Sequence, residues 1–153
     1  MNAITLLREQ HRRLGALILR VASERGARLA LVLQLVEELM TQLSIEDHFF
    51  LCTVADATGI GMDRYREEQA TVRNAVLQAV FVEDDDAAFD ARLRELKAAF
   101  ERHARAMDRD LLPIVETEVR GDDLEAIGLR MESYWHAAVE GGTSRASQVH
   151  AAE

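Results

Sequence analysis

Residues Phe100–Pro113 read FERHARAMDRDLLP, a stretch in which apolar residues recur at helical spacing. Apolar residues before, within and after it fall within about 40° of Phe100 on a helical wheel: Leu93, Leu96, Met107, Leu111 and Ile114. On the same wheel His103 lies at roughly −60° and Asp108 at roughly +80°. Both side chains therefore flank the predicted buried face, as two groups do when they converge on one object inside a helical bundle.

The composition favours an all-helical protein. A chain of 153 residues is long enough for one domain with its own core. Hydrophobic residues make up 48% of it, yet aromatic residues make up only 5% and Pro113 is the single proline. Ala, Leu, Glu and Arg dominate, and these residues favour helices over strands. The predicted fold class is therefore all-α.

The net charge, the apolar runs, the N-terminal residues and the single cysteine limit which partners and which cellular location we expect. A net charge of −9 argues against nucleic acid or an anionic membrane as the main partner. No apolar run approaches the length of a membrane-spanning helix, and the start of the chain, MNAITLLREQ, has no secretory signal pattern. Cys52 alone cannot form an internal disulfide, which agrees with a reducing compartment. We therefore expect a cytoplasmic protein.

Four long amphipathic segments and a shorter fifth are predicted to be helices. They cover residues 2–25, 27–57, 62–81, 87–119 and 122–140. Short connections between long helices make neighbours antiparallel, so we predict a left-handed, up-down four-helix bundle with a short C-terminal fifth helix. Residues 1–140 are expected to form a single domain, and residues 141–153 a flexible tail.

The apolar face of each long segment carries polar residues near its middle. In chain order these are His11; Gln42 and Glu46; Tyr65 and Gln69; and His103 with Asp108. A lone core histidine is usually just hydrogen-bonded, but an unpaired buried carboxylate costs several kcal/mol. Glu46 therefore needs a cationic partner such as Arg66 or Arg73, a raised pKa, or a metal ion.

The joint pattern favours a metal centre. Two histidines and two carboxylates from three helices, His11, Glu46, His103 and Asp108, suit a divalent or ferric ion. By contrast, His48 and His136 fall off the apolar faces and His150 lies in the tail, so these three are not predicted to be ligands. Cys52 is interpreted as a small packed residue, and no motif for a catalytic nucleophile or a phosphate loop is present.

Four stretches carry a resemblance to a known family. They are AITLLREQHRRLGAL, LVEELMTQLSIEDHFFL, YREEQATVRNAV and FERHARAMDRDLLPIVE. In this order they resemble the helices of a hemerythrin-like domain, also called the HHE cation-binding domain. The resemblance implies a non-haem di-iron centre that binds dioxygen. It also implies His11 as a ligand, Glu46 and Asp108 as bridging carboxylates, Asp47 as the acid that often follows the bridging glutamate, and His103 as the ligand of the fourth helix.

Two ligand positions depart from the family pattern. Gln42 and Gln69 stand where the family has histidines of the second and third helices. Glutamine is a neutral, weak oxygen ligand and does not replace imidazole fully. The options are an altered di-iron site, a mononuclear site, or an empty bundle in which the glutamines hydrogen-bond Glu46 and Asp108. Tyr65, one turn before Gln69, is a further weak ligand candidate.

Three hypotheses follow. The first is a metal-binding protein that senses or handles iron, oxygen, or reactive oxygen or nitrogen species, with iron, zinc or another divalent ion bound. The second is a metal-free descendant of the fold that serves as a protein-interaction module. The third is an oxidase-type enzyme, which would need an open coordination position and a substrate pocket. A homodimer or another protein partner stays open.

Overall fold

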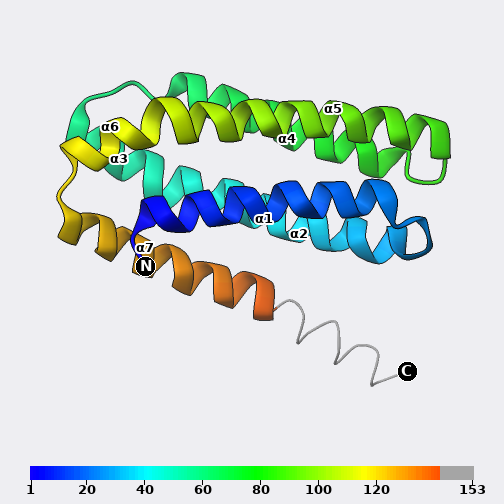
Figure 1. The fold of residues 1–153 in the computed structure, drawn as a ribbon, viewed down its shortest axis with the longest axis horizontal. Helices are drawn as coiled ribbons and strands as arrows, with labels where there is room; N and C mark the ends of the chain where they lie inside the picture. The colour runs from blue at the N-terminus through cyan, green and yellow to red at the C-terminus, as the bar shows by residue number, and fades with distance from the viewer. Residues whose placement is uncertain (142–153) are drawn as a thin grey trace.

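Long helices packed side by side make up the protein (Figure 1). The structure, a computed structural model, describes residues 1–141, and within these residues it contains no strand. The predicted all-α class and helical bundle are therefore confirmed. That residues 1–140 form a single domain stays a prediction, and the predicted tail lies outside the described residues except for Gly141.

The first hairpin of the bundle joins two predicted helices. It consists of α1 (Ala3–Ser23), the 3₁₀ turn η1 (Arg25–Ala27), α2 (Arg28–Ile45), the π-helical turn η2 (Glu46–Leu51) and α3 (Cys52–Thr58). The side-chain oxygen of Asn2 accepts a hydrogen bond from the Thr5 N–H and so caps the start of α1. Gly59, with φ of 72°, ends α3 in the left-handed conformation that glycine adopts without strain.

The second hairpin lies beside the first, and a last helix packs against the outside of the first hairpin. It consists of α4 (Asp63–Phe81), α5 (Asp86–Arg105), the π-helical turn η3 (Ala106–Leu111) and α6 (Leu112–Glu118). It is followed by α7 (Gly121–Trp135) and the π-helical turn η4 (His136–Glu140). Asp85 caps α5 by accepting a hydrogen bond from the Ala88 N–H. In Figure 1 α7 runs along the outside of the α1–α2 hairpin.

Buried polar residues divide the core into two apolar halves. On α1, His11 lies between Leu7 of one half and Leu14 of the other. On α5 and η3, His103 separates Phe100 from Met107 in the same way. The layer between the two halves consists of His11, Gln42, Glu46, Gln69 and His103. The bundle thus places these five polar side chains at one level, between the two apolar halves of its core.

The π-helical turn η3 corrects the predicted apolar stripe of the fourth helix. A π-helical turn holds one extra residue, so the buried face moves by one position beyond it. Ile114 was predicted to lie on the stripe but is 44% exposed, whereas Leu112 and Val115 are buried. Pro113, in the first turn of α6, has no N–H to donate to the regular helical pattern, which favours the irregular turn before it.

Another packing interpretation from the sequence is also wrong. Cys52 is exposed instead of packed, with its Sγ 3.7 Å from Nη2 of Arg66.

The last helix approaches the start of the chain closely. A Cβ added to Gly128 would lie 2.2 Å from the carbonyl oxygen of Met1. Only glycine leaves room for this contact, so Gly128 is what lets α7 dock on α1. Among the described helices, none combines the length and the apolarity needed to cross a membrane.

Candidate metal centre

His11 is turned into the core by the helix that carries it. Leu7 and Leu14, four residues before it and three after, are both fully buried, so the same face of α1 buries His11. Its Nε2 lies 2.8 Å from Oε1 of Glu46, and its Nδ1 lies 2.9 Å from Oδ1 of Asp108. The imidazole therefore bridges two carboxylates.

Glu46 is the centre of the polar layer. It is the first residue of η2, and no part of its side chain is exposed. Its Oε1 lies 2.8 Å from Nε2 of His11 and accepts a hydrogen bond from Nε2 of Gln42 at 3.0 Å. Its Oε2 lies 2.6 Å from Nε2 of His103 and accepts a hydrogen bond from Nε2 of Gln69 at 3.0 Å. Each carboxylate oxygen thus has one imidazole and one carboxamide beside it.

His103 completes a buried His–Glu–His cluster. One ligand atom each from His11, Glu46 and His103 lies within 4.8 Å of the others. The two imidazole rings are 5.9 Å apart and inclined at 75° to each other. His11, Gln69 and His103 all contact Glu46, so the structure brings these four polar side chains together.

Asp108 lies on the other side of His11 from Glu46. Its side chain is 32% exposed, and it contacts Nδ1 of His11, the nitrogen that faces away from the Glu46 contact. The structure therefore brings Asp108 to the cluster through His11. Its predicted role as a metal ligand stays a prediction.

A second carboxylate near the cluster was missed by the sequence interpretation. Oε2 of Glu68 lies 3.9 Å from Nδ1 of His103, on the side of that ring opposite Glu46. Each histidine thus has Glu46 at one nitrogen and another acid toward the other nitrogen. The signal was present, because Glu68 is the residue next to Gln69 in the EEQ sequence.

The remaining predicted positions lie further from Glu46. Tyr65 is buried in the apolar half of the core that contains Leu7, and burial raises the pKa of its phenol. Asp47 is directed to the surface, where Arg66 Nε donates to its Oδ1 at 2.9 Å. The arginine suggested as a partner for Glu46 is therefore the partner of Asp47. His48 and His136 are exposed, as predicted, and His150 lies outside the described residues.

The electrostatics of the cluster hold Glu46 ionised and His11 protonated. Burial by itself lowers the pKa of His11, but hydrogen bonds to Asp108 and Glu46 outweigh it and raise the pKa to about 9. Burial raises the pKa of Glu46, but the nearby His103 and His11 outweigh it and hold the pKa well below its usual value. The carboxylate is thus ready to bind a cation, and a proton on His11 would have to leave first.

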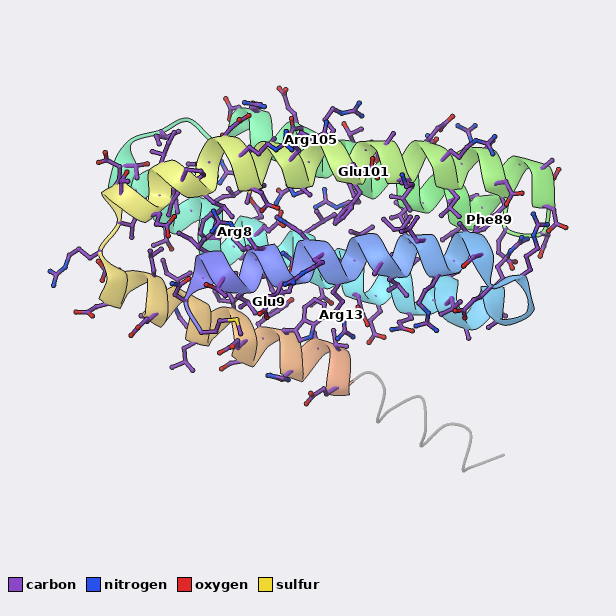
Figure 2. All side chains as sticks on the ribbon, in the orientation of Figure 1. Arg8, Glu9, Arg13, Phe89, Glu101 and Arg105 are labelled. Carbon is purple, nitrogen blue, oxygen red and sulfur yellow. The ribbon has the colours of Figure 1, made fainter. Side chains whose placement is uncertain are left out.

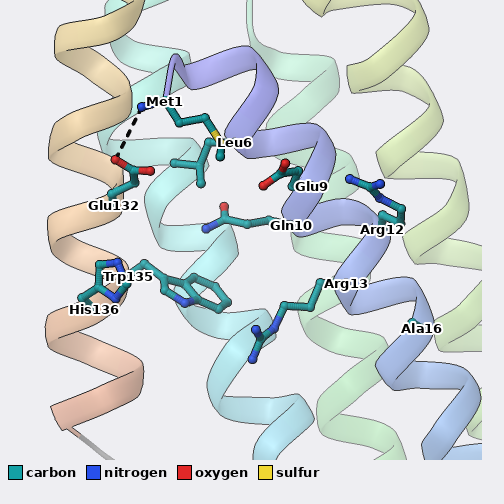
Figure 3. A pocket seen from close by; sticks show the side chains of 10 residues that line it. All are labelled: Met1, Leu6, Glu9, Gln10, Arg12, Arg13, Ala16, Glu132, Trp135 and His136. Carbon is teal, nitrogen blue, oxygen red and sulfur yellow. Dashed lines mark ion pairs between the residues drawn. The ribbon is translucent and has the colours of Figure 1, made fainter.

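A separate cavity lies between α1 and the last helix (Figure 3). Its volume is about 490 Å³, and Gln10 and Trp135 come from its two sides. The charges around it are mixed, since Glu9, Glu132, Arg12 and Arg13 all line it. It does not reach any of the three residues of the His–Glu–His cluster.

Comparison with known proteins identifies a family. A family model described as the hemerythrin HHE cation-binding domain matches residues 2–115. The matched segment includes the buried polar layer and Asp108, and α7 lies beyond it. Comparisons with curated proteins and with solved structures give no match. Since the family model covers most of the chain and the His–Glu–His cluster lies inside it, this chain belongs to the hemerythrin HHE cation-binding family.

Proposed function

We propose that the protein binds an iron ion at His11, Glu46 and His103, and that it senses or handles iron, oxygen, or reactive oxygen or nitrogen species. The observation that carries the proposal is the fully buried cluster of two imidazoles and one carboxylate within 4.8 Å. Membership of a cation-binding family supports it. A cytoplasmic location and dioxygen as a partner belong to the same proposal.

The chemistry of the donors fits a metal ion. Imidazole nitrogen and carboxylate oxygen suit iron and zinc, and three such groups from α1, η2 and α5 converge on one point. Within the described residues, buried Gln42 Oε1 and His103 Nδ1 have no hydrogen-bond partner. A buried carbonyl oxygen without a donor is a group that a cation would satisfy.

The arrangement of donors supports one strong site more than two. Each oxygen of Glu46 has a single imidazole beside it, and the second group at each oxygen is a carboxamide. A dinuclear centre would leave each ion with one nitrogen donor from the layer, whereas a single ion could take both imidazoles. We therefore favour a mononuclear site, in which Gln42 and Gln69 orient the carboxylate.

A bound iron ion would supply Lewis acidity and one-electron redox chemistry. The residues of the chain determine what surrounds it. Full burial of Glu46 and His103 excludes bulk water, and the lowered pKa of Glu46 retains a negative charge opposite a cation. Asp108 holds the His11 ring through Nδ1, so that Nε2 faces Glu46.

Elemental analysis tests this proposal. Protein purified without chelator from cells grown with added iron or zinc is expected to contain about one metal ion per chain, and Glu46→Ala is expected to contain none. Glu67→Ala, at an exposed position on α4, is the matched control and should retain the wild-type metal content. An absorption spectrum of the same samples identifies ferric iron.

A metal-free bundle that serves as an interaction module is the second candidate. The observation that favours it is the full set of four donors around the two oxygens of Glu46, all from the protein. This arrangement satisfies the carboxylate without any ion. If wild type carries no metal after either supplementation and Glu46→Leu raises the melting temperature, Glu46 is only a tolerated buried acid and this second candidate replaces the first.

A further inference from the structure

A cavity of about 400 Å³ opens between α1 and α5 beside the candidate centre. His11 and Asp108 both line it, and Asp108 is the more exposed of the two. Gly15, Phe100 and Ala104 form an apolar part of the wall. The cavity therefore gives solvent a route to the edge of the His–Glu–His cluster.

Three arginines from two helices surround this cavity. Arg8 and Arg12 come from α1, and Arg105 comes from the end of α5. In Figure 2 Arg8 and Arg105 lie on these two neighbouring helices, with Glu101 next to Arg105 on α5. Arginines of both helices thus line the cavity.

The acidic residues of the cavity wall have partners within the protein, whereas the three arginines have none in the described part of the chain. Glu101 Oε1 lies 2.7 Å from Nζ of Lys97, and Asp108 is bound to His11. Both acids of the wall therefore have partners already. Within residues 1–141, the side chains of Arg8, Arg12 and Arg105 make no hydrogen bond or ion pair. The protein carries a net charge of −9, so these three unpaired arginines make the cavity a positively charged region on a negatively charged protein.

We propose that this cavity binds a small organic anion with a carboxylate or phosphate head. Guanidinium groups bind both kinds of oxyanion through parallel hydrogen bonds, and the Phe100 ring and Ala104 offer an apolar surface to the rest of the molecule. Such an anion would lie beside Asp108, at the exposed edge of the cluster. Its action as a ligand or regulator of the metal centre rests on the proposed function, whereas its binding does not.

Isothermal titration of the chelator-treated full-length protein tests the site. The probes are benzoate, phenyl phosphate and inorganic phosphate. We expect saturable binding of one benzoate or one phenyl phosphate per chain, at least tenfold tighter than inorganic phosphate, and the stronger of the two identifies the head group. Arg8→Gln combined with Arg105→Gln should weaken it at least tenfold, because it removes a cation from each side.

Two further variants make the result specific. Arg94→Gln combined with Arg130→Gln changes the net charge equally at exposed positions outside this cavity and should leave binding unchanged. Gly15→Leu retains all three arginines but places a side chain in the cavity, since a Cβ at Gly15 meets only Phe100 Cε1 at 3.9 Å. It should abolish binding of the phenyl compounds while circular dichroism shows an intact fold.

Equal weakening by the two double-arginine variants, or unaltered binding in Gly15→Leu, would overturn the proposal. So would the absence of saturable binding, or inorganic phosphate binding as tightly as phenyl phosphate. Because the titrations use metal-free protein, these outcomes are independent of whether His11, Glu46 and His103 hold an ion.

Discussion

Nε2 of His103 lies 2.6 Å from Oε2 of Glu46, and neither side chain is exposed to solvent. His11 stands in the corresponding relationship to Oε1, at 2.8 Å. One carboxylate therefore separates two imidazoles that come from different helices. A glutamine also contacts each oxygen of Glu46. Substitution of these two glutamines should therefore change the metal affinity of the site while leaving the histidines and Glu46 in place.

Gln42→His and Gln69→His are each expected to increase iron occupancy. Both side chains are buried and already directed at Glu46, so a histidine there adds a nitrogen donor at a position that faces the cluster. Iron per chain, measured by elemental analysis after growth at limiting iron, should rise in each variant. Asn74→His, at an exposed position on α4, serves as the control. An unchanged iron content in both variants would contradict a site centred on Glu46.

Asp108→Asn distinguishes a ligand from a group that positions His11. If Asp108 only orients the imidazole, asparagine still accepts the hydrogen bond from Nδ1, and metal affinity should fall about 10- to 100-fold. If Asp108 is itself a ligand, binding should be lost as completely as in Glu46→Ala. Competition with a fluorescent zinc chelator measures the affinity. Because the side chain reaches His11 from the far side of the ring, we expect the smaller effect.

The metal-free protein should lose stability as pH rises from 6.5 to about 9. The pKa of His11 rises from 6.5 to about 9 on folding, so the folded state holds this proton more tightly and the stabilisation is complete only below pH 6.5. The loss would be on the order of 3 kcal/mol, from 1.36 kcal/mol per pKa unit. Glu46 acts in the opposite direction, and the stability from its lowered pKa disappears as pH falls below its usual value of 4.5.

Urea unfolding at several pH values measures this dependence. The chelator-treated wild type is expected to be most stable between about pH 4.5 and 6.5, and His11→Gln should flatten the decline above 6.5. Zinc binding should show the reverse trend and strengthen toward pH 9, because the ion takes the place of the His11 proton. A wild-type profile as flat as that of His11→Gln would contradict the proposed protonation of His11.

Gly128→Ala should loosen the last helix. The added Cβ would lie 2.2 Å from the Met1 carbonyl oxygen and 2.9 Å from the Ala3 nitrogen, and backbone atoms cannot turn aside as a side chain can. We expect destabilisation of about 1–3 kcal/mol, as for other overpacked sites, together with a change in the fluorescence of Trp135. Gly121→Ala is the control, because a Cβ there meets nothing within 4 Å. Equal stability of the two variants would contradict the close packing.

The sequence predicted the helices well because each apolar stripe repeats over several turns. The predicted segment 62–81 became Asp63–Phe81, and Glu46 was recognised because a carboxylate among apolar residues is rare. Ile114 was misplaced because periodicity assumes regular turns, whereas η3 shifts the phase. Which nitrogen of His11 meets which acid could not be predicted, since that depends on how α1 and η3 are set against each other in space.

The polar layer between the two apolar halves also has a consequence for folding. Sliding any one of α1, α2, α4 or α5 by a turn along its neighbours would move a histidine, a glutamate or a glutamine of the layer into an apolar half and leave its partners unmatched. The bundle could tolerate many exchanges among its leucines and valines, but only one axial alignment of the helices closes the network around Glu46. The residues that would bind a metal ion therefore also specify the native axial register of the helices during folding.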